Sequence, residues 1–134
     1  MILDTSALAA ILFGEPEAAL FTKLIHDAER CLIGAANFVE LSMVVEAQIG
    51  PDAGRQCDIF FRRAGIVIEP LSVEQAHLAR QAFLDFGKGR HPAGLNFGDC
   101  FAYALAKATG EQLLFKGKDF SKTDIKAAAG SAWA

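Results

Sequence analysis

Short apolar runs separated by longer amphipathic stretches organise this chain. Four of these runs predict buried strands, at Met1–Asp4, Cys31–Ala35, Ile66–Ile68 and Gln112–Phe115. Runs of this length, bounded by Gly, Pro or polar residues, are typical of strands in the interior of a sheet. Because helical periodicity fills the intervals between them, the pattern predicts a three-layer α/β/α fold with a central parallel sheet of four to five strands.

Six helices are expected in these intervals. Thr5 and Ser6 are candidate N-caps of the first helix, Asn37 begins the third, and Asn96 begins the sixth, whose apolar face includes Phe97. The sequence leaves two possibilities open for the Ala- and Gly-rich tail, which either adds an edge strand or frays. The expected helices lie at about 7–13, from 16 past 25, 37–49, 52–63, 72–86 and 96–109.

Length and composition predict one domain over residues 1–134. Hydrophobic residues make up 52% of the 134 residues, so the chain has enough apolar surface to bury a core. The formal net charge of -3 argues against broad, sequence-independent coating of DNA, but it leaves room for a local basic rim around an acidic pocket.

The cysteines indicate a compartment more than a chemistry. Cys31, Cys57 and Cys100 are odd in number, widely spaced and without a C-x-x-C pair, which argues against a disulfide framework or a zinc site. We expect reduced, buried thiols in a cytoplasmic protein. No apolar run approaches the length of a membrane span, and a first strand that begins at Met1 leaves no room for a signal peptide.

Four acidic residues occupy corresponding places in their units. Asp4 closes the first strand, Glu40 and Asp99 follow the starts of the third and sixth helices, and Asp119 follows the fourth strand. In an α/β protein such positions meet at the sheet edge where strands end, which is where ligands bind. Because clustered carboxylates repel each other unless a cation holds them, the pattern predicts a Mg²⁺ or Mn²⁺ site acting on phosphates.

Each acid also has an explanation that needs no ligand. Asn37-x-x-Glu40 and Asn96-x-x-Asp99 both resemble capping boxes at helix N-termini. The two interpretations are compatible, because the positive end of a helix dipole keeps a carboxylate ionised, as a metal ligand must be.

Two further residues are candidates to support the acidic cluster. Ser6 follows the first strand closely, and its hydroxyl is placed to hold a carboxylate or a metal-bound water. Asp124 lies a short turn beyond Asp119 and is a candidate to assist the cluster.

Basic residues lie just before two of the acids. Lys88, Arg90 and His91 occupy a Gly- and Pro-rich loop before Asp99, and Lys116 and Lys118 precede the fourth acid. A cationic rim of this kind would hold a nucleic-acid backbone while the acids act on one phosphate. A solvated connecting loop is the alternative.

Four segments, in order along the chain, resemble the VapC-type PIN-domain toxins of prokaryotic type II toxin–antitoxin pairs. They are Met-Ile-Leu-Asp-Thr-Ser-Ala at the start, Asn-Phe-Val-Glu-Leu at 37–41, the stretch 89–106 around Asn-Phe-Gly-Asp-Cys, and Leu-Leu-Phe-Lys-Gly-Lys-Asp-Phe at 113–120. The resemblance covers essentially the whole chain, and its most specific part is the stretch 89–106.

The resemblance implies a PIN-like fold and a Mg²⁺- or Mn²⁺-dependent endoribonuclease. Asp4, Glu40 and Asp99 match the family's acidic core, Asp119 its fourth acid and Ser6 a supporting position. It further implies a homodimer, an RNA substrate and a cognate VapB-like antitoxin whose C-terminal segment blocks the pocket.

One position departs from the family pattern. Many PIN domains have Thr-x-Asp or Thr-x-Asn after the last apolar strand, where this chain has Phe115-Lys116-Gly117. Either Asp119 supplies the fourth ligand, or the site works with three acids and a single metal.

Two other phosphate-handling enzyme classes lack their defining residues in this chain. A haloacid-type phosphatase needs a second Asp in Asp4-Thr5-Ser6, and a receiver domain needs an Asp where this chain has Glu69-Pro70. A catalytically weak PIN-fold protein that acts mainly as an antitoxin- or RNA-binding module is the remaining alternative.

Overall fold

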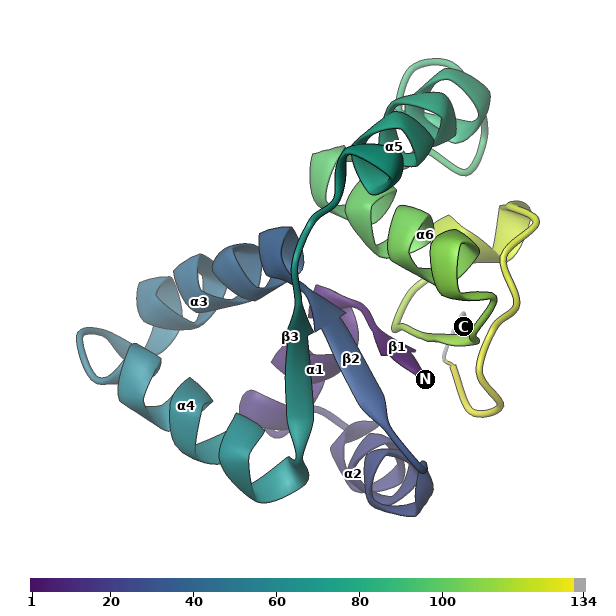
Figure 1. Cartoon of the computed structure of the whole chain (residues 1–134). Helices are drawn as coiled ribbons and strands as arrows, with labels where there is room; N and C mark the ends of the chain where they lie inside the picture. Colours follow the sequence, from purple (N-terminus) through teal and green to yellow (C-terminus); the bar gives the residue numbers. More distant parts are fainter. Residues whose placement is uncertain (132–134) are drawn as a thin grey trace.

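The computed structural model describes residues 1–131, which form one parallel sheet with helices packed on both faces (Figure 1). All neighbouring strands are parallel, and their spatial order is β3-β2-β1-β4. The predicted fold class is therefore confirmed. The strands are β1 (Ile2–Leu3), β2 (Cys31–Gly34), β3 (Ile66–Glu69) and β4 (Leu113–Leu114).

The helices follow the strands in the predicted alternation. They are α1 (Thr5–Leu12), α2 (Ala18–Asp27), α3 (Ala35–Ile49), α4 (Ala53–Ala64), α5 (Val73–Phe86) and α6 (Phe97–Thr109), with a 3₁₀ turn, η1 (Asp119–Lys122).

Two hydrophobic cores lie on opposite faces of the sheet. Successive strand residues point to opposite sides, so Leu3 and Ile33 pack with α1 to α4, whereas Ile2 and Leu32 pack with α5 and α6. Figure 1 shows α5 and α6 together on one side of the strands and α4 and α2 on the other. The apolar doublets of β1 and β2 thus serve both layers at once.

Three local predictions were wrong. Helix α1 begins at Thr5 with Asp4 as its N-cap, so Thr5 and Ser6 lie inside the helix. Helix α3 begins at Ala35, two residues before the predicted start. Phe97 is 80% exposed and does not belong to the buried face of α6, because it lies on the wall of an open groove between α5 and α6.

The segment after η1 runs beside β4. Ala127 forms a parallel bridge with Leu113, and the Ser131 hydroxyl donates to the Leu113 carbonyl at 3.2 Å while accepting from the Phe115 amide at 3.3 Å. Up to residue 131 the tail therefore adds to the sheet edge, which was one of the two predicted outcomes. Within the described residues, none of the helices combines the length and apolar character that a membrane span needs.

Candidate active site

Asp4 stands at the end of β1 and is the most deeply buried of the four acids. Its side chain is 3% exposed, and Oδ2 accepts hydrogen bonds from the Ser6 amide at 3.0 Å and the Ser6 hydroxyl at 2.6 Å. Oδ1 is buried without a hydrogen-bond partner. Since a buried carboxylate oxygen normally has a partner, this atom marks a position where a ligand is expected.

Asp99 lies in the first turn of α6 and is held by the backbone. Asn96 caps this helix by accepting from the Asp99 amide at 2.9 Å, and Asp99 Oδ2 accepts from the Asn96 amide at 3.0 Å. The predicted capping box is thus confirmed here. Asp99 is only 9% exposed, and its two hydrogen bonds with Asn96 tie its position to the start of the helix.

The acids are close enough to change each other's ionisation. Burial, and after it the charges of Asp4 and Asp119, raise the pKa of Asp99 to about 8. Burial raises the pKa of Asp4 to about 6, against the hydrogen bonds from Ser6, and the Glu40 carboxylate adds to the rise. The four acids predicted from the sequence are therefore brought to one edge of the sheet, where Asp4 and Asp99 favour bound protons in the absence of a cation.

Glu40 is held by side chains instead of by a helix start. Its Oε1 accepts from the Thr5 hydroxyl at 2.5 Å and from Asn37 Nδ2 at 3.3 Å. Asn37 lies inside α3, whose N-cap is Gly34, so the predicted capping box of Asn37 and Glu40 is wrong. The reason is that the helix begins two residues early, which moves Asn37 from a cap to a position facing α6.

Asn37 and Gly98 connect α3 to α6. Asn37 is fully buried, and its Nδ2 donates to the Gly98 carbonyl at 3.0 Å. The Glu40 carboxylate lies so close to the Gly98 Cα that a Cβ there would overlap it. A residue larger than glycine would thus displace the acid.

Sequence reasoning gave Thr5 and Asn37 other roles, as helix caps, and missed Gly98. Asn37 and Glu40 are three residues apart and so share a helix face, which is a signal that the sequence contains. A glycine in the first turn of a helix, as at Gly98, also indicates close approach of another group. The contact of Thr5 with Glu40 spans 35 residues and had no such signal.

The predicted basic rim is divided by the structure. Arg90 stacks its guanidinium on the Phe83 ring, 5.2 Å from the centroid, and His91 packs edge-on against Phe86 and accepts from the Ala93 amide at 3.0 Å. These contacts give the loop a defined shape. Lys88 and Lys118 are exposed.

Lys116 connects the loop after β4 to the first helix. Its ammonium pairs with Glu15 at 3.0 Å and Glu17 at 3.1 Å, and its amide donates to the Ser6 hydroxyl at 3.0 Å. Ser6 in turn donates to Asp4, so it relays the position of this loop to the buried acid. The side chain of Lys116 is therefore engaged within the protein.

Asp124 does not join the acids. Its two oxygens accept from the Tyr103 hydroxyl at 2.5 Å and the Lys107 ammonium at 2.7 Å, on the middle of α6. The nearness of Asp124 to Asp119 in sequence suggested a shared site, but the chain turns through η1 between them.

The donor set suits a hard divalent cation. All the candidate ligands are carboxylate oxygens, and the unpartnered Oδ1 of Asp4 faces no protein donor. Within residues 1–131, however, no three acidic, His or Cys side chains already surround a single cation position. Glu40 Oε1 accepts from Thr5 and Asn37, so a cation that binds Glu40 through this oxygen would have to replace both donors.

Comparisons with known proteins identify one family. The PIN domain family model matches residues 1–126. Ribonuclease VapC30 of Mycobacterium tuberculosis is 45% identical over 129 residues, covering 96% of this chain and 98% of that protein. Ribonuclease VapC of Mycolicibacterium smegmatis is 45% identical over 127 residues, covering 95% and 98%.

Solved structures share the fold at low identity. The VapC20 toxin of Mycobacterium tuberculosis superposes with a TM-score of 0.75 at 16% identity, over 95% of this chain and 97% of that chain. A chain of VapBC2 from Rickettsia felis, bound to a DNA fragment from its promoter, gives a TM-score of 0.72 at 16% identity, over 94% of each chain. From its sequence relatives and its fold, this chain belongs to the PIN-domain family and, within it, to the VapC ribonucleases.

Proposed function

We propose that this chain is the toxin of a type II toxin–antitoxin pair and hydrolyses RNA phosphodiesters with Mg²⁺ or Mn²⁺ held by Asp4, Glu40, Asp99 and Asp119. The observation that carries the proposal is the meeting of buried Asp4, with its unpartnered oxygen, and buried Asp99 at one sheet edge. The relatives are named as ribonucleases, which supports RNA as the substrate.

Each residue has a distinct part in this proposal. A divalent cation bound there would lower the pKa of its water and offset negative charge on the phosphate. Ser6 fixes one oxygen of Asp4 and leaves the other free to bind. The capping box fixes Asp99, while Glu40, held by side chains, is the acid that adjusts, and Asp119 is the fourth acid. Exposed Lys88 and Lys118 are the parts of the basic rim that remain available to the RNA backbone.

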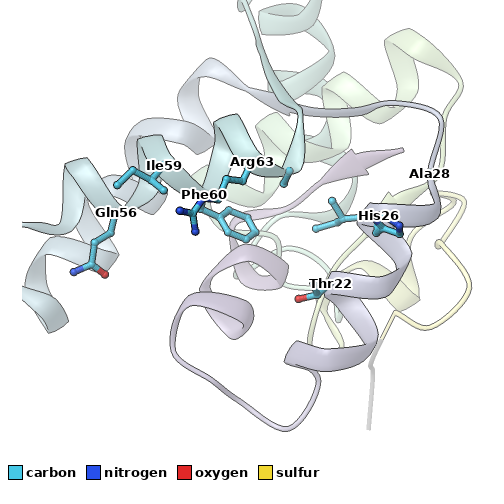
Figure 2. A pocket seen from close by; sticks show the side chains of 9 residues that line it. Thr22, His26, Ala28, Gln56, Ile59, Phe60 and Arg63 are labelled. Atoms are coloured by element: carbon cyan, nitrogen blue, oxygen red, sulfur yellow. The ribbon is translucent and has the colours of Figure 1, made fainter.

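The antitoxin partner is supported by solved toxin–antitoxin complexes with the same fold, such as one from Klebsiella pneumoniae. We place a further segment of the antitoxin, distinct from the C-terminal segment expected at the acids, in the pocket between α2 and α4, a cavity of about 510 Å³ (Figure 2). In Figure 2, the Phe60 ring of α4 points toward α2, whose Thr22 and His26 lie on the other side of this pocket. Its apolar floor and the Arg63 rim suit an amphipathic helix with acidic residues.

The predicted homodimer has a candidate surface on the other side of the sheet. A groove of about 530 Å³ between α5 and α6 is almost entirely apolar, and Phe97 and Phe83 on its walls are 80% and 39% exposed. Apolar surface of this kind on a small domain indicates a protein contact. The groove is lined by Leu71, Ala76, Ala79, Arg80, Phe83, Phe97, Cys100 and Phe101.

The proposed activity is tested with purified protein freed of antitoxin. It should cleave single-stranded or looped RNA with Mg²⁺ or Mn²⁺ and stop with chelator. Asp4→Asn and Asp99→Asn should each lose activity, while Asp85→Asn on the exposed surface of α5 should keep it. Cleavage that resists chelation would refute the metal mechanism. Binding of RNA without any cleavage would favour the catalytically weak binding module.

The antitoxin site is tested separately by co-expression. Ile59→Asp in the α2–α4 pocket should prevent the cognate antitoxin from co-purifying and leave cleavage by the free toxin intact. Val67→Asp, on the exposed face of β3, is a matched control for an added charge and should retain the antitoxin. Equal capture by both variants would place the antitoxin elsewhere.

A further inference from the structure

A polar clamp on α6 holds the segment that carries the fourth acid. The Tyr103 hydroxyl donates to Asp124 Oδ1 at 2.5 Å, and the Lys107 ammonium donates to Oδ2 at 2.7 Å. The same ammonium lies 5.7 Å from the centroid of the Tyr103 ring. Both oxygens of Asp124 are thereby engaged by one face of one helix.

The clamp and Asp99 share that face. Asp99, Tyr103 and Lys107 are spaced four residues apart along α6, which places them in one row on a helix. Tyr103 is only 7% exposed and packs against Phe86, so the row is rigid at its centre. The residue that receives the clamp, Asp124, therefore has a fixed position relative to Asp99.

The clamped segment begins with Asp119. Between Asp119 and Asp124 the chain makes the single turn of η1, whose Phe120 is buried against Phe115 with ring centroids 5.1 Å apart. The Thr123 hydroxyl closes the turn by donating to the Phe120 carbonyl at 2.7 Å. A short, internally bonded turn transmits the position of one end to the other, so the place of Asp119 follows from the clamp.

Stability alone does not account for the clamp. The side chains of Asp124 and Lys107 are 57% and 36% exposed, and ion pairs in such positions contribute little to folding. Tyr103 offers a buried ring and could pack without its hydroxyl. The hydroxyl adds a short hydrogen bond, which fixes the position of Asp124 along the helix.

We propose that Tyr103 and Asp124 are positioning residues, which hold Asp119 beside Asp99 so that it can serve as the fourth acid. The inference rests on the proposed function, because it needs Asp119 to be a ligand. In this proposal Asp124 is not a member of the acidic cluster. Its contacts with Tyr103 and Lys107 fix the segment that carries Asp119.

The test measures Mn²⁺ affinity by calorimetric titration in paired backgrounds. Tyr103→Phe keeps the ring and removes the hydroxyl, and it should weaken Mn²⁺ binding by about tenfold, as expected for loss of a residue that orients a ligand. In an Asp119→Asn background the same change should have less than about a twofold effect, because the acid it positions is gone. Asp124→Asn, which keeps an acceptor for Tyr103, should lose less affinity than Asp124→Ala.

Two controls separate positioning from folding and from the proposed function. Ser72→Ala removes an N-cap of α5, so it should lower the melting temperature and leave Mn²⁺ affinity unchanged. Amide hydrogen exchange of the apo protein reports on the clamp without metal, and Tyr103→Phe should speed exchange in η1.

The outcomes are distinct. Equal loss of Mn²⁺ affinity in both backgrounds, or none where Asp119→Asn itself weakens binding, would overturn the proposal. If Asp4→Asn, Asp99→Asn and Asp119→Asn all leave Mn²⁺ binding unchanged, the proposed metal site fails. Unchanged exchange in η1 of Tyr103→Phe would then overturn the clamp independently.

Discussion

The first turns of α3 and α6 look alike in sequence and differ in structure. Both read Asn-x-x-acid, with Asn37 and Glu40 in one and Asn96 and Asp99 in the other. In α6 this spacing forms a capping box, so backbone amides fix the acid. In α3 the helix starts earlier, and Glu40 is held only by the side chains of Thr5 and Asn37.

The difference separates a fixed acid from an adjustable one. An acid in a capping box moves only if the helix start moves, whereas an acid held by side chains can exchange those partners for another ligand. Asp99 thus defines the place of the site, and Glu40 provides the part that responds to what binds there. The same spacing encodes either role, depending on where the helix begins.

The largest effect is expected from Gly98→Ala, which breaks the adjustable side. The new Cβ would occupy the place of the Glu40 carboxylate and displace it. The RNA cleavage rate should fall about a hundredfold, as expected for a misplaced reactive group. The free energy of unfolding should change little, because the gain of about 1 kcal/mol in helix propensity offsets the lost hydrogen bonds.

Gly54→Ala is the matched control for that change. Gly54 lies in α4 with open space around its missing Cβ, so this variant should be fully active and about 1 kcal/mol more stable. If Gly98→Ala cleaves RNA as fast as Gly54→Ala, the position of Glu40 has no bearing on activity.

Asn37→Ala should lower the free energy of unfolding more than Asn96→Ala, the corresponding change in α6. It removes a fully buried side chain and leaves the Gly98 carbonyl without its partner, for a loss of about 2–3 kcal/mol in the free energy of unfolding. Urea denaturation measures the loss. A change below about 1 kcal/mol would show that the bridge between α3 and α6 is not needed for folding.

The two buried acids, Asp4 and Asp99, should make the stability of the protein depend on pH. The pKa values of Asp4 and Asp99 are raised from 3.8 to about 6 and about 8. Their stabilising protonation is complete below about pH 4 and is lost as the pH rises through these values. In chelator, stability should therefore fall from about pH 4 to about pH 6 through both acids and on to about pH 8 through Asp99, by at most about 1.4 kcal/mol per pH unit for each group.

Thermal melting across this range separates the contributions. Asp99→Asn should remove the part of the decline between pH 6 and 8, and saturating Mn²⁺ should abolish the decline in the unmodified protein by favouring the ionised acids. A melting temperature that rises with pH in chelator would contradict the raised pKa values of the two buried acids.

Asn96→Ala should have the smallest effect. It removes the cap of α6 but leaves the backbone amide that Asp99 accepts from, so the expected loss is about 1 kcal/mol. Its ratio to the loss from Asn37→Ala, measured under the same urea conditions, is the sharpest test of the comparison. Equal losses would mean that the two turns are equivalent after all.

The sequence alone determined the alternation of strands and helices, the parallel sheet and the acids at its edge. These follow from local rules, because apolar runs pair in a sheet and strand ends collect on one side. It also predicted the capping box of α6 from residues three apart, although the same spacing in α3 gave a wrong prediction.

Only the tertiary structure decided how these acids are held. Helix α3 begins directly after Gly34, which is both the last residue of β2 and the N-cap of the helix. This start turns Asn37 toward Gly98, 61 residues away in sequence. Lys116 was predicted to face RNA, yet Glu15 and Glu17, about 100 residues earlier, surround its ammonium. Asp124 is drawn to Tyr103 in the same way. Such contacts depend on packing between distant segments, which periodicity and spacing along the chain do not encode.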